Sequence, residues 1–286
     1  MGEKLKIAVQ KSGRLKEDSL KILKECGISI DNGKDQLKAS AFNFPLEVLY
    51  LRNSDIPQYV EDGVADIAIV GENVVIEKEK ELDVLQKLGF SKCRLAMAVP
   101  KDVDYSGLEY FNGKKLATSY PNSLRQFLDA NKLDCEIHEI SGSVEIAPNI
   151  GLADGICDLV SSGSTLFKNG LTEVEEILVS EACLVANKNI SNLKSAILDR
   201  LLFRMKSVLA AKNNKYILLN VPNDKIEDII KVLPGMNSPT VMPLAKEGWS
   251  SLHSVITEND FWGVIDQLKL TGAEGILIIP IQKMVL

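Results

Sequence analysis

The chain has 286 residues, of which 45% are hydrophobic and 25% charged, and its formal net charge is −6. These ordinary globular values allow one to three domains, and the acidic balance argues against binding to nucleic acid or to an anionic membrane surface. No apolar run approaches the roughly 18 residues of a membrane span. The start is lysine-rich and leads straight into a strand, and the five cysteines are scattered without CxxC spacing. We therefore expect no signal peptide, no disulfide framework, and a reduced, cytoplasmic protein.

The first two thirds of the chain alternate apolar strands with amphipathic helices, which is typical of an α/β fold. The strands are expected at Lys6–Gln10, Leu46–Arg52, Ile67–Val70, Arg94–Pro100, Lys115–Thr118, Cys135–Ile140, Ile156–Val160 and Cys183–Asn187. The helices are expected at Lys16–Cys26, Asp55–Asp62, Leu124–Asn131, Val144–Leu152 and Leu193–Lys212.

After about Lys212 the order of elements changes to β-α-β-β-α-β, which is that of a ferredoxin-like α+β domain. The expected elements are a strand at Lys215–Val221, a helix at Asp224–Leu233, strands at Val241–Leu244 and Ser251–Thr257, a helix at Asp260–Leu270 and a strand at Gly275–Pro280. A unit of this size can fold alone, and it carries no catalytic constellation. We therefore interpret it as an accessory domain.

A short sequence pattern occurs twice. Gly63-Val-Ala-Asp66 leads into an apolar strand and the turn Gly71-Glu-Asn-Val74, and Gly151-Leu-Ala-Asp154 leads into another strand and the turn Ser161-Ser-Gly-Ser-Thr165. The repeat indicates two similar lobes. Their turns fall at the carboxyl ends of strands, where open α/β sheets bind ligands.

The turn Ser161–Thr165 is the first candidate site. Its hydroxyls and backbone N–H groups suit a phosphate, and Gly163 allows close backbone approach. Asp158 in the preceding strand and Glu145 upstream, at the start of a helix capped by Ser143, could accept hydrogen bonds from sugar hydroxyls. The alternative from the residues alone is a solvated loop, with Asp158 as an N-cap.

Further candidates follow other strands. Gln10-Lys-Ser-Gly-Arg14 offers two cations after the first strand, and Gly71-Glu-Asn73 offers donors and acceptors after another. Arg94 opens a strand and Tyr120 follows one. Their plainer alternatives are an ordinary loop, a solvated strand end for Arg94 and a core edge for Tyr120. The two histidines have neither a nearby nucleophile nor metal-ligand spacing, so a catalytic triad or a zinc site is not expected.

Together these stretches resemble the ATP phosphoribosyltransferase family, which catalyses the first step of histidine biosynthesis, in its long form. The matching segments are QKSGRL (10–15), DGVADIAIVGENV (62–74), NGKKLATSYP (112–121), GSVEIAPNIGLADGICDLVSSGSTLFKNGL (142–171) and LPGMNSPTVMPLA (233–245). The resemblance implies a two-lobed periplasmic-binding-protein-like (type II) catalytic region and a C-terminal ferredoxin-like regulatory domain. It implies lobe I at 1–98 with 181–211, lobe II at 99–180 and the regulatory domain at 212–286.

The implied reaction joins ATP and 5-phosphoribosyl 1-diphosphate (PRPP), with Mg²⁺, to give N1-(5-phosphoribosyl)-ATP and diphosphate. The resemblance assigns the PRPP 5-phosphate to Ser161, Ser162, Gly163, Ser164 and Thr165, and the ribose hydroxyls to Glu145 and Asp158. Residues expected on the facing ATP and diphosphate side are Lys11, Gly13, Arg14, Gly71, Glu72, Asn73, Arg94 and Tyr120. Glu145, Asp158, Lys11 and Arg14 are the expected catalytic residues.

The resemblance further implies feedback inhibition by histidine, competition by AMP at the active site, and homo-oligomers, as dimers and hexamers. The expected histidine positions are Asn220, Met236, Thr240, Val255 and Gly275, with Asn220 at a place where an acid is found in some relatives. Two competing hypotheses are a solute-binding protein of the same architecture and a regulatory subunit that has lost catalysis. The two anion-binding turns and the intact set of Glu145, Asp158 and Ser161–Thr165 argue against them.

Overall fold

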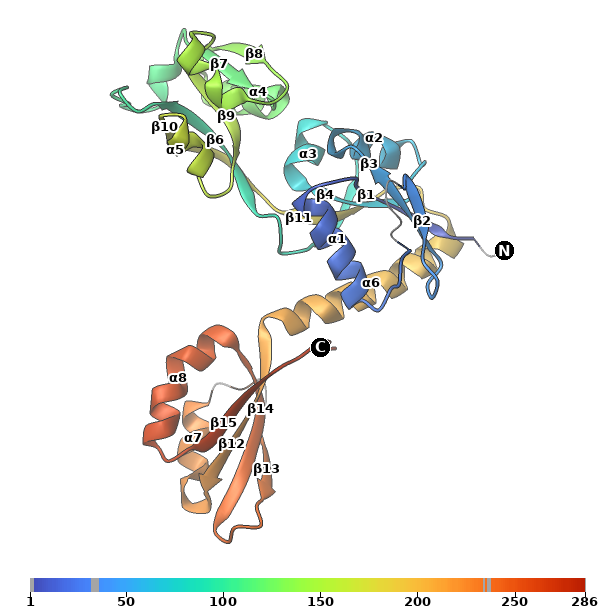
Figure 1. Ribbon diagram of the computed structural model, residues 1–286, viewed down its shortest axis with the longest axis vertical. Coiled ribbons are helices and arrows are strands. Elements are labelled where there is room, and N and C mark those ends of the chain that lie inside the picture. Colours follow the sequence, from blue (N-terminus) through green and yellow to red (C-terminus); the bar gives the residue numbers. More distant parts are fainter. Residues whose placement is uncertain (1–2, 32–35, 234, 236–237, 286) are drawn as a thin grey trace. The chain divides into compact units, whose positions relative to one another are not determined.

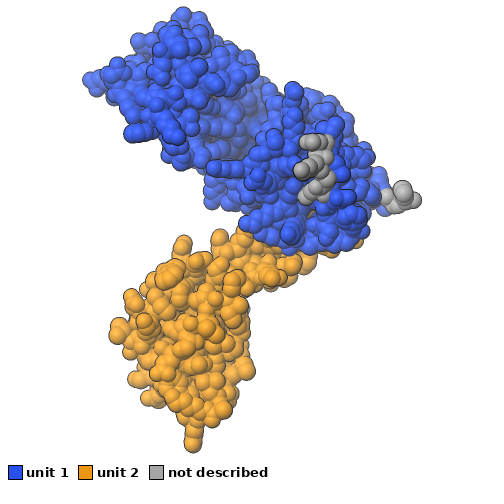
Figure 2. Space-filling view, in the orientation of Figure 1, with its two compact units in different colours: residues 1–198 blue, residues 199–286 orange. Residues whose placement is uncertain are grey.

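The computed structural model describes residues 3–31, 36–233, 235 and 238–285. The chain divides into two compact units, Met1–Leu198 and Asp199–Leu286 (Figure 2). The division falls between Leu198 and Asp199, inside the long helix α6 (Asn192–Lys212). The C-terminal domain was expected to begin at residue 212, the end of this helix. Among the described residues, no helix combines the length and the apolar character needed to cross a bilayer.

Unit 1 contains two sheets (Figure 1). The first has the order β2-β3-β1-β4-β11-β5, and the second has the order β10-β6-β9-β7-β8. The first sheet consists of β1 (Leu5–Gln10), β2 (Lys38–Ser40), β3 (Leu46–Leu51), β4 (Ile67–Gly71), β5 (Asp83–Lys87) and β11 (Ala182–Ala186). The second consists of β6 (Cys93–Pro100), β7 (Lys115–Thr118), β8 (Glu136–Glu139), β9 (Gly155–Val160) and β10 (Leu171–Ser180).

The two sheets repeat one topology. The order β3-β1-β4-β11-β5 in the first sheet matches the order β8-β7-β9-β6-β10 in the second. In each, a central strand pairs in parallel with both neighbours, and the next strand along is antiparallel. That antiparallel strand is reached from the other sheet, because β6 follows β5 and β11 follows β10 along the chain. This double crossing confirms the two-lobed periplasmic-binding-protein-like fold, and we call the two halves lobe I and lobe II.

The repeated Gly-x-Ala-Asp segments have the same structural role in both lobes. The Asp66 carboxylate accepts a hydrogen bond from the Lys6 N–H at 2.7 Å, and the Asp154 carboxylate accepts one from the Lys115 N–H at 2.8 Å. Each aspartate thus fixes the start of the neighbouring parallel strand. The turns that follow β4 and β9 consequently occupy equivalent positions in the two lobes.

Most of the predicted helices of unit 1 are present. They are α1 (Arg14–Glu25), α2 (Ile56–Glu61, after a 3₁₀ turn at Asn53–Asp55) and α4 (Pro121–Ala130). The helix predicted at Val144–Leu152 was wrong, because two 3₁₀ turns (Val144–Ile146 and Pro148–Ile150) take its place. Pro148 has no N–H to donate, and Gly151 has a φ of 74°, which together end any continuous helix.

Five short or half-exposed elements were not predicted from the sequence: β2, β5, β10, α3 (Glu72–Glu77) and α5 (Ser164–Lys168). The two helices are too short to show a helical period. Strand β10 has two irregularities in its pairing with β6, between Glu173 and Glu175 and between Glu176 and Leu178. Such irregularities break the alternation of polar and apolar residues by which a strand is recognised.

Unit 2 has the predicted ferredoxin-like order. Its sheet runs β13-β14-β12-β15, from β12 (Asn214–Pro222), β13 (Thr240–Pro243), β14 (Trp249–Thr257) and β15 (Glu274–Pro280). Helices α7 (Ile226–Val232) and α8 (Glu258–Leu270) pack on one face, where Ile217, Leu219, Leu252 and Ile256 meet Ile229 and Leu268. The unit therefore has a hydrophobic core of its own.

Candidate active site

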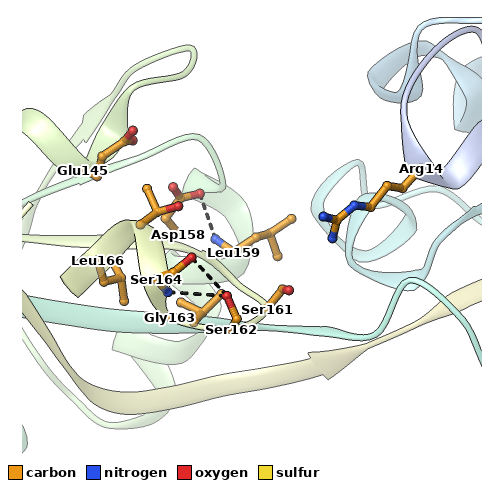
Figure 3. A pocket seen from close by; sticks show the side chains of 11 residues that line it. Arg14, Glu145, Asp158, Leu159, Ser161, Ser162, Gly163, Ser164 and Leu166 are labelled. Atoms are coloured by element: carbon orange, nitrogen blue, oxygen red, sulfur yellow. Dashed lines mark hydrogen bonds between the residues drawn. The ribbon is translucent and has the colours of Figure 1, made fainter. Parts of the chain in front are cut away.

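A cavity of about 350 Å³ lies at the end of β9 (Figure 3). It is lined by Arg14, Glu145 and the continuous segment Asp158–Leu166. The segment belongs to lobe II, whereas Arg14 begins α1 of lobe I and extends toward the segment across the cavity (Figure 3). Thus residues far apart in the sequence bring carboxylates, hydroxyls and one guanidinium to a single cavity.

The loop Ser161–Thr165 is open to a ligand. Gly163 has a φ of 74° and immediately precedes α5, so the loop needs a residue without a Cβ there. The Ser162 hydroxyl donates to the Ser164 hydroxyl at 3.1 Å, and both serines face the cavity (Figure 3). The hydroxyls and N–H groups of this loop form a concave donor surface, which suits a phosphate.

Asp158 and Glu145 provide the carboxylates. Asp158 is half-buried, and its Oδ1 accepts a hydrogen bond from the Leu159 N–H at 2.8 Å. Burial raises the pKa of Asp158, and the negative charge of Glu145 raises it further. Glu145 lies in a 3₁₀ turn after Ser143, which has a left-handed backbone (φ 51°) and makes no side-chain cap. The predicted helix cap by Ser143 was therefore wrong, although Glu145 does line the cavity.

Tyr120 lies beside this site, at the N-terminus of α4. Its N–H donates to the Thr118 hydroxyl at 2.9 Å. Burial is the main cause that raises the pKa of its phenol, and the charge of Asp158 is the second. Tyr120 also lines a second cavity of about 420 Å³ whose walls come from both lobes. This cavity is lined by Asn53, Ser54, Val74, Glu77, Lys78, Ser119, Tyr120, Glu139, Ile140, Ser141 and Gly142.

The first loop of lobe I contributes through Arg14. Gly13, with a φ of 86°, allows the sharp turn into α1. Lys11 is exposed, and its N–H donates to the Leu51 carbonyl at 2.8 Å, which ties the loop to β3. Neither residue lines the two cavities described above.

The predicted Gly71-Glu72-Asn73 site lines neither cavity in this structure. Asn73 is buried: its N–H donates to the Ser180 hydroxyl at 3.0 Å, and that hydroxyl donates to Asn73 Oδ1 at 2.9 Å. Glu72 forms an ion pair with Lys87 at 2.9 Å. A Cβ at residue 71 would collide with Asn73 Oδ1, so glycine is required for packing.

Arg94 is more than a solvated strand end. Its guanidinium forms a two-point ion pair with Glu173 on the adjacent strand β10, which raises its pKa. A third nitrogen, Nη1, donates to the carbonyl of Ser161 at 3.4 Å. Arg94 therefore contacts the loop Ser161–Thr165 at Ser161, while two of its three nitrogens donate to Glu173.

The carboxylates of the first cavity could help to hold a divalent metal ion that arrives with a phosphate ligand. Among the described residues there is no group of three or more His, Cys, Asp or Glu side chains that could hold a metal alone. Magnesium is commonly bound by one or two carboxylates together with substrate phosphates. Glu145 and Asp158, which line the same cavity, could supply them.

In unit 2, the predicted histidine positions that the structure describes lie on neighbouring strands. Asn220 pairs with Ser251 and with Glu274, Thr240 pairs with His253, and Val255 pairs with Tyr216. In β12 the residues Ile217, Leu219 and Val221 are buried against helices α7 and α8. Asn220, which alternates with them, therefore lies on the opposite face of the sheet, and the strand pairing places Thr240 and Val255 on that same face. Gly275 (φ 57°) is close enough that a Cβ there would lie 3.1 Å from Asn220 Nδ2. Met236 lies outside the described residues.

Sequence reasoning missed three residues that support the site: Glu77, Glu173 and Ser180. Each acts through a contact with a residue at least 45 positions away. No local pattern in the sequence marks such contacts.

Comparisons with known proteins identify the family of the chain. The family model "ATP phosphoribosyltransferase" matches residues 52–207, and "HisG, C-terminal domain" matches residues 211–283. A protein of Cytophaga hutchinsonii named ATP phosphoribosyltransferase is 58% identical over 285 residues, covering 100% of both chains. One of the same name from Bacteroides thetaiotaomicron is 57% identical, covering 98% of this chain and 99% of its own.

A solved structure described as the ATP phosphoribosyl transferase (HisG:HisZ) complex from Thermotoga maritima superposes with a TM-score of 0.60. It is 29% identical and covers 71% of this chain and 98% of its own. The family models together span both units described here. The chain therefore belongs to the ATP phosphoribosyltransferase family, in its long form with the C-terminal domain.

Proposed function

We propose that the chain transfers the 5-phosphoribosyl group of PRPP to N1 of ATP and releases diphosphate, the first step of histidine biosynthesis. The observation that carries this proposal is the first cavity, in which a hydroxyl-rich loop, two carboxylates and one arginine meet. These groups match a phosphate, sugar hydroxyls and a departing diphosphate respectively.

PRPP would bind mainly to lobe II. Its 5-phosphate would occupy the loop of Ser161, Ser162, Gly163, Ser164 and Thr165. Asp158 and Glu145 would accept hydrogen bonds from the ribose hydroxyls. Burial raises the pKa of Asp158 because it disfavours the charged carboxylate. Hydrogen bonds donated by the ribose hydroxyls would favour the charged form and so offset this cost.

The chemistry requires no covalent intermediate. Adenine N1 has its own lone pair, so the main barrier is the loss of diphosphate from the anomeric carbon, which builds positive charge on the ribose. The carboxylates of Glu145 and Asp158 stabilise that charge, and Arg14, with Lys11, attracts the diphosphate. A bound magnesium ion would neutralise charge on the departing group. Alignment of the two substrates supplies much of the remaining rate acceleration.

ATP would approach from the lobe I side. Tyr120 lines the second cavity and follows β7, which pairs with the strand that carries Asp158, so it would lie where the two substrates meet. Lys11, Gly13 and Arg14 follow β1 of lobe I, and Arg14 lines the first cavity. Gly71, Glu72, Asn73 and Arg94 would act indirectly, by holding the surrounding loops.

We also propose that unit 2 binds histidine as a feedback inhibitor, at Asn220, Thr240, Val255 and Gly275, with Met236 nearby in the sequence. The shared sheet face of three of these residues supports the proposal. AMP would compete in the catalytic cavity. We expect the chain to act in the cytoplasm as a homo-oligomer, a dimer or a hexamer.

The direct test is a near-ultraviolet absorbance assay with ATP, PRPP and Mg²⁺, with and without L-histidine. Pyrophosphatase is included because the reaction is readily reversible. A PRPP-dependent rise that histidine suppresses is the expected result. A rise indifferent to histidine would contradict the regulatory proposal alone. No rise from folded protein would contradict the transferase proposal and favour a solute-binding or non-catalytic role.

A further inference from the structure

A buried carboxylate joins the two lobes of unit 1. Glu77, at the end of α3 in lobe I, has a side chain that is almost completely buried, with 5% of the residue exposed. Its Oε1 accepts a hydrogen bond from the Asn122 N–H at 3.0 Å. Its Oε2 accepts from the Ser123 N–H at 2.9 Å and from the Ser123 hydroxyl at 2.7 Å. A buried carboxylate with three donors is well compensated.

The acceptor meets a need of helix α4. The first N–H groups of a helix have no partner within the helix, and a residue at the N-cap position usually supplies one. In α4 the N-cap residue is Tyr120, which makes no side-chain cap, and the next residue is Pro121, which has no N–H. Glu77 therefore provides, from the other lobe, the cap that α4 lacks. The negative charge also suits the positive end of the helix dipole.

The residue held in this way lies next to the reaction centre. Tyr120 lies two residues before Asn122, the first of the capped residues, and its own N–H is held by the Thr118 hydroxyl. Tyr120 follows the end of β7, where Thr118 pairs with Cys157 of β9, the residue next to Asp158. The start of α4 thus links Glu77 to the carboxylate expected to hold the ribose.

Helix α3 is attached to lobe II at its other end as well. Asn73, at its start, exchanges two hydrogen bonds with Ser180, the last residue of β10. This short lobe I helix is therefore attached at one end to strand β10 and at the other to helix α4, both in lobe II. Loss of the Glu77 side-chain contacts would leave this end attached through the Asn122 side chain, which donates to the Glu77 carbonyl at 2.9 Å, but it would leave the first N–H groups of α4 without an acceptor.

We propose that Glu77 is a positioning residue of the phosphoribosyl transfer: by capping α4 it fixes Tyr120 beside Asp158 and sets the register between the two lobes. The inference rests on the proposed function, because alignment matters only where substrates held by different lobes must meet. Glu77 itself does not line the cavity that would hold PRPP.

The test compares Glu77→Gln with Glu79→Gln. Glu79, two residues after the end of α3, makes an exposed contact with Gln126 of α4 at 3.0 Å, so it is a matched control. For Glu77→Gln we expect kcat to fall about 10- to 100-fold, as misalignment does, with the KM for PRPP changed less than about twofold. For Glu79→Gln, kcat should stay within about twofold of the wild type.

Amide hydrogen exchange gives a readout that needs no turnover. In Glu77→Gln, a peptide spanning 118–126 should exchange faster than in the wild type, and a peptide spanning 161–168 should be unchanged. An unchanged kcat despite faster exchange would overturn the inference and leave Glu77 a structural cap. An equal loss of kcat in the Glu79→Gln control would overturn it too.

Should Glu77→Gln fail to fold, Ser123→Ala removes one of the three donors and keeps the backbone. Its kcat is expected to fall severalfold at an unchanged KM for PRPP, and a wild-type kcat would refute the proposal. Absence of turnover by the wild-type chain would contradict the proposed function. An active wild type whose kcat is matched by Glu77→Gln or Ser123→Ala would contradict only the positioning role of Glu77.

Discussion

At the residue scale, Asp158 shows how the site departs from what stability alone would select. The carboxylate is half-buried in a strand, accepts one backbone hydrogen bond and lies near a second carboxylate, Glu145. Burial and that charge raise its pKa, so the folded state holds the proton more tightly than the unfolded chain does. Asp158 therefore costs stability at neutral pH, which its proposed contact with ribose explains.

Replacement of Asp158 by asparagine should reveal this cost. Because the folded-state pKa lies above that of the unfolded chain, the wild type loses stability as pH rises between the two values. We expect Asp158→Asn to unfold at a higher temperature than the wild type at pH 7. The difference should disappear below about pH 4, where the unfolded carboxyl is also protonated. Thermal unfolding at several pH values measures it, and a lower unfolding temperature at pH 7 would contradict the sign.

The same variant should lose activity. The neutral amide cannot stabilise positive charge on the ribose, so kcat/KM for PRPP is expected to fall about 100-fold or more. Wild-type kinetics with PRPP would remove Asp158 from the site. The activity of the wild type should also decline at low pH, at a pKa above the ordinary value of an aspartate.

At the scale of elements, the repeated Gly-x-Ala-Asp segment explains why the two turns lie at equivalent positions. Asp66 and Asp154 each accept the N–H that starts the adjacent parallel strand. They differ in their surroundings: Asp66 is buried and also pairs with Lys194 at 2.8 Å, whereas the side chain of Asp154 is 42% exposed.

This difference predicts unequal effects of the same substitution. Asp66→Ala leaves the partly buried ammonium group of Lys194 and the Lys6 N–H without their acceptor, and should lower the free energy of unfolding by about 3 kcal/mol. Asp154→Ala should lower it by about 1 kcal/mol, because water can replace the lost acceptor. Denaturant titration of both variants provides the comparison. Equal losses would show that the burial of the Asp66 pair contributes nothing.

At the scale of the whole molecule, each unit has its own hydrophobic core, and the proposed substrates and inhibitor bind to different units. A ligand that binds only the folded state stabilises it by an amount set by its concentration over its Kd, about 2.7 kcal/mol at 100 times Kd. Thermal stabilisation can therefore locate the two ligands independently of turnover.

We expect L-histidine to raise the unfolding temperature of the Asp158→Asn variant as much as that of the wild type. PRPP with Mg²⁺ should stabilise the wild type more than the variant. Scanning calorimetry of the full chain measures both effects. Histidine stabilisation that vanishes in Asp158→Asn would mean that histidine binds at the catalytic cavity instead.

Local pattern was sufficient for much of this protein. Short apolar runs located β1, β3, β4 and β9, and the ferredoxin-like order of the last domain was predicted correctly, because each run is bounded by polar or glycine residues. The motif around Glu145, Asp158 and Ser161–Thr165 predicted a polar cavity, and these residues do line one. Residues that are consecutive in the sequence at the end of a strand lie close together however the rest of the chain folds.

Only the tertiary structure decided what depends on distant partners. It buried Asn73 against Ser180, paired Arg94 with Glu173, and placed Glu77 under the start of a helix 45 residues away. It also replaced a helix predicted at 144–152 with two 3₁₀ turns. The sequence by itself determined the family, the order of the elements and the contiguous binding loop, because these follow from short-range periodicity and motif. Which polar residues face a ligand and which hold the lobes together depends on long-range packing and hydrogen bonding, and no local pattern records it.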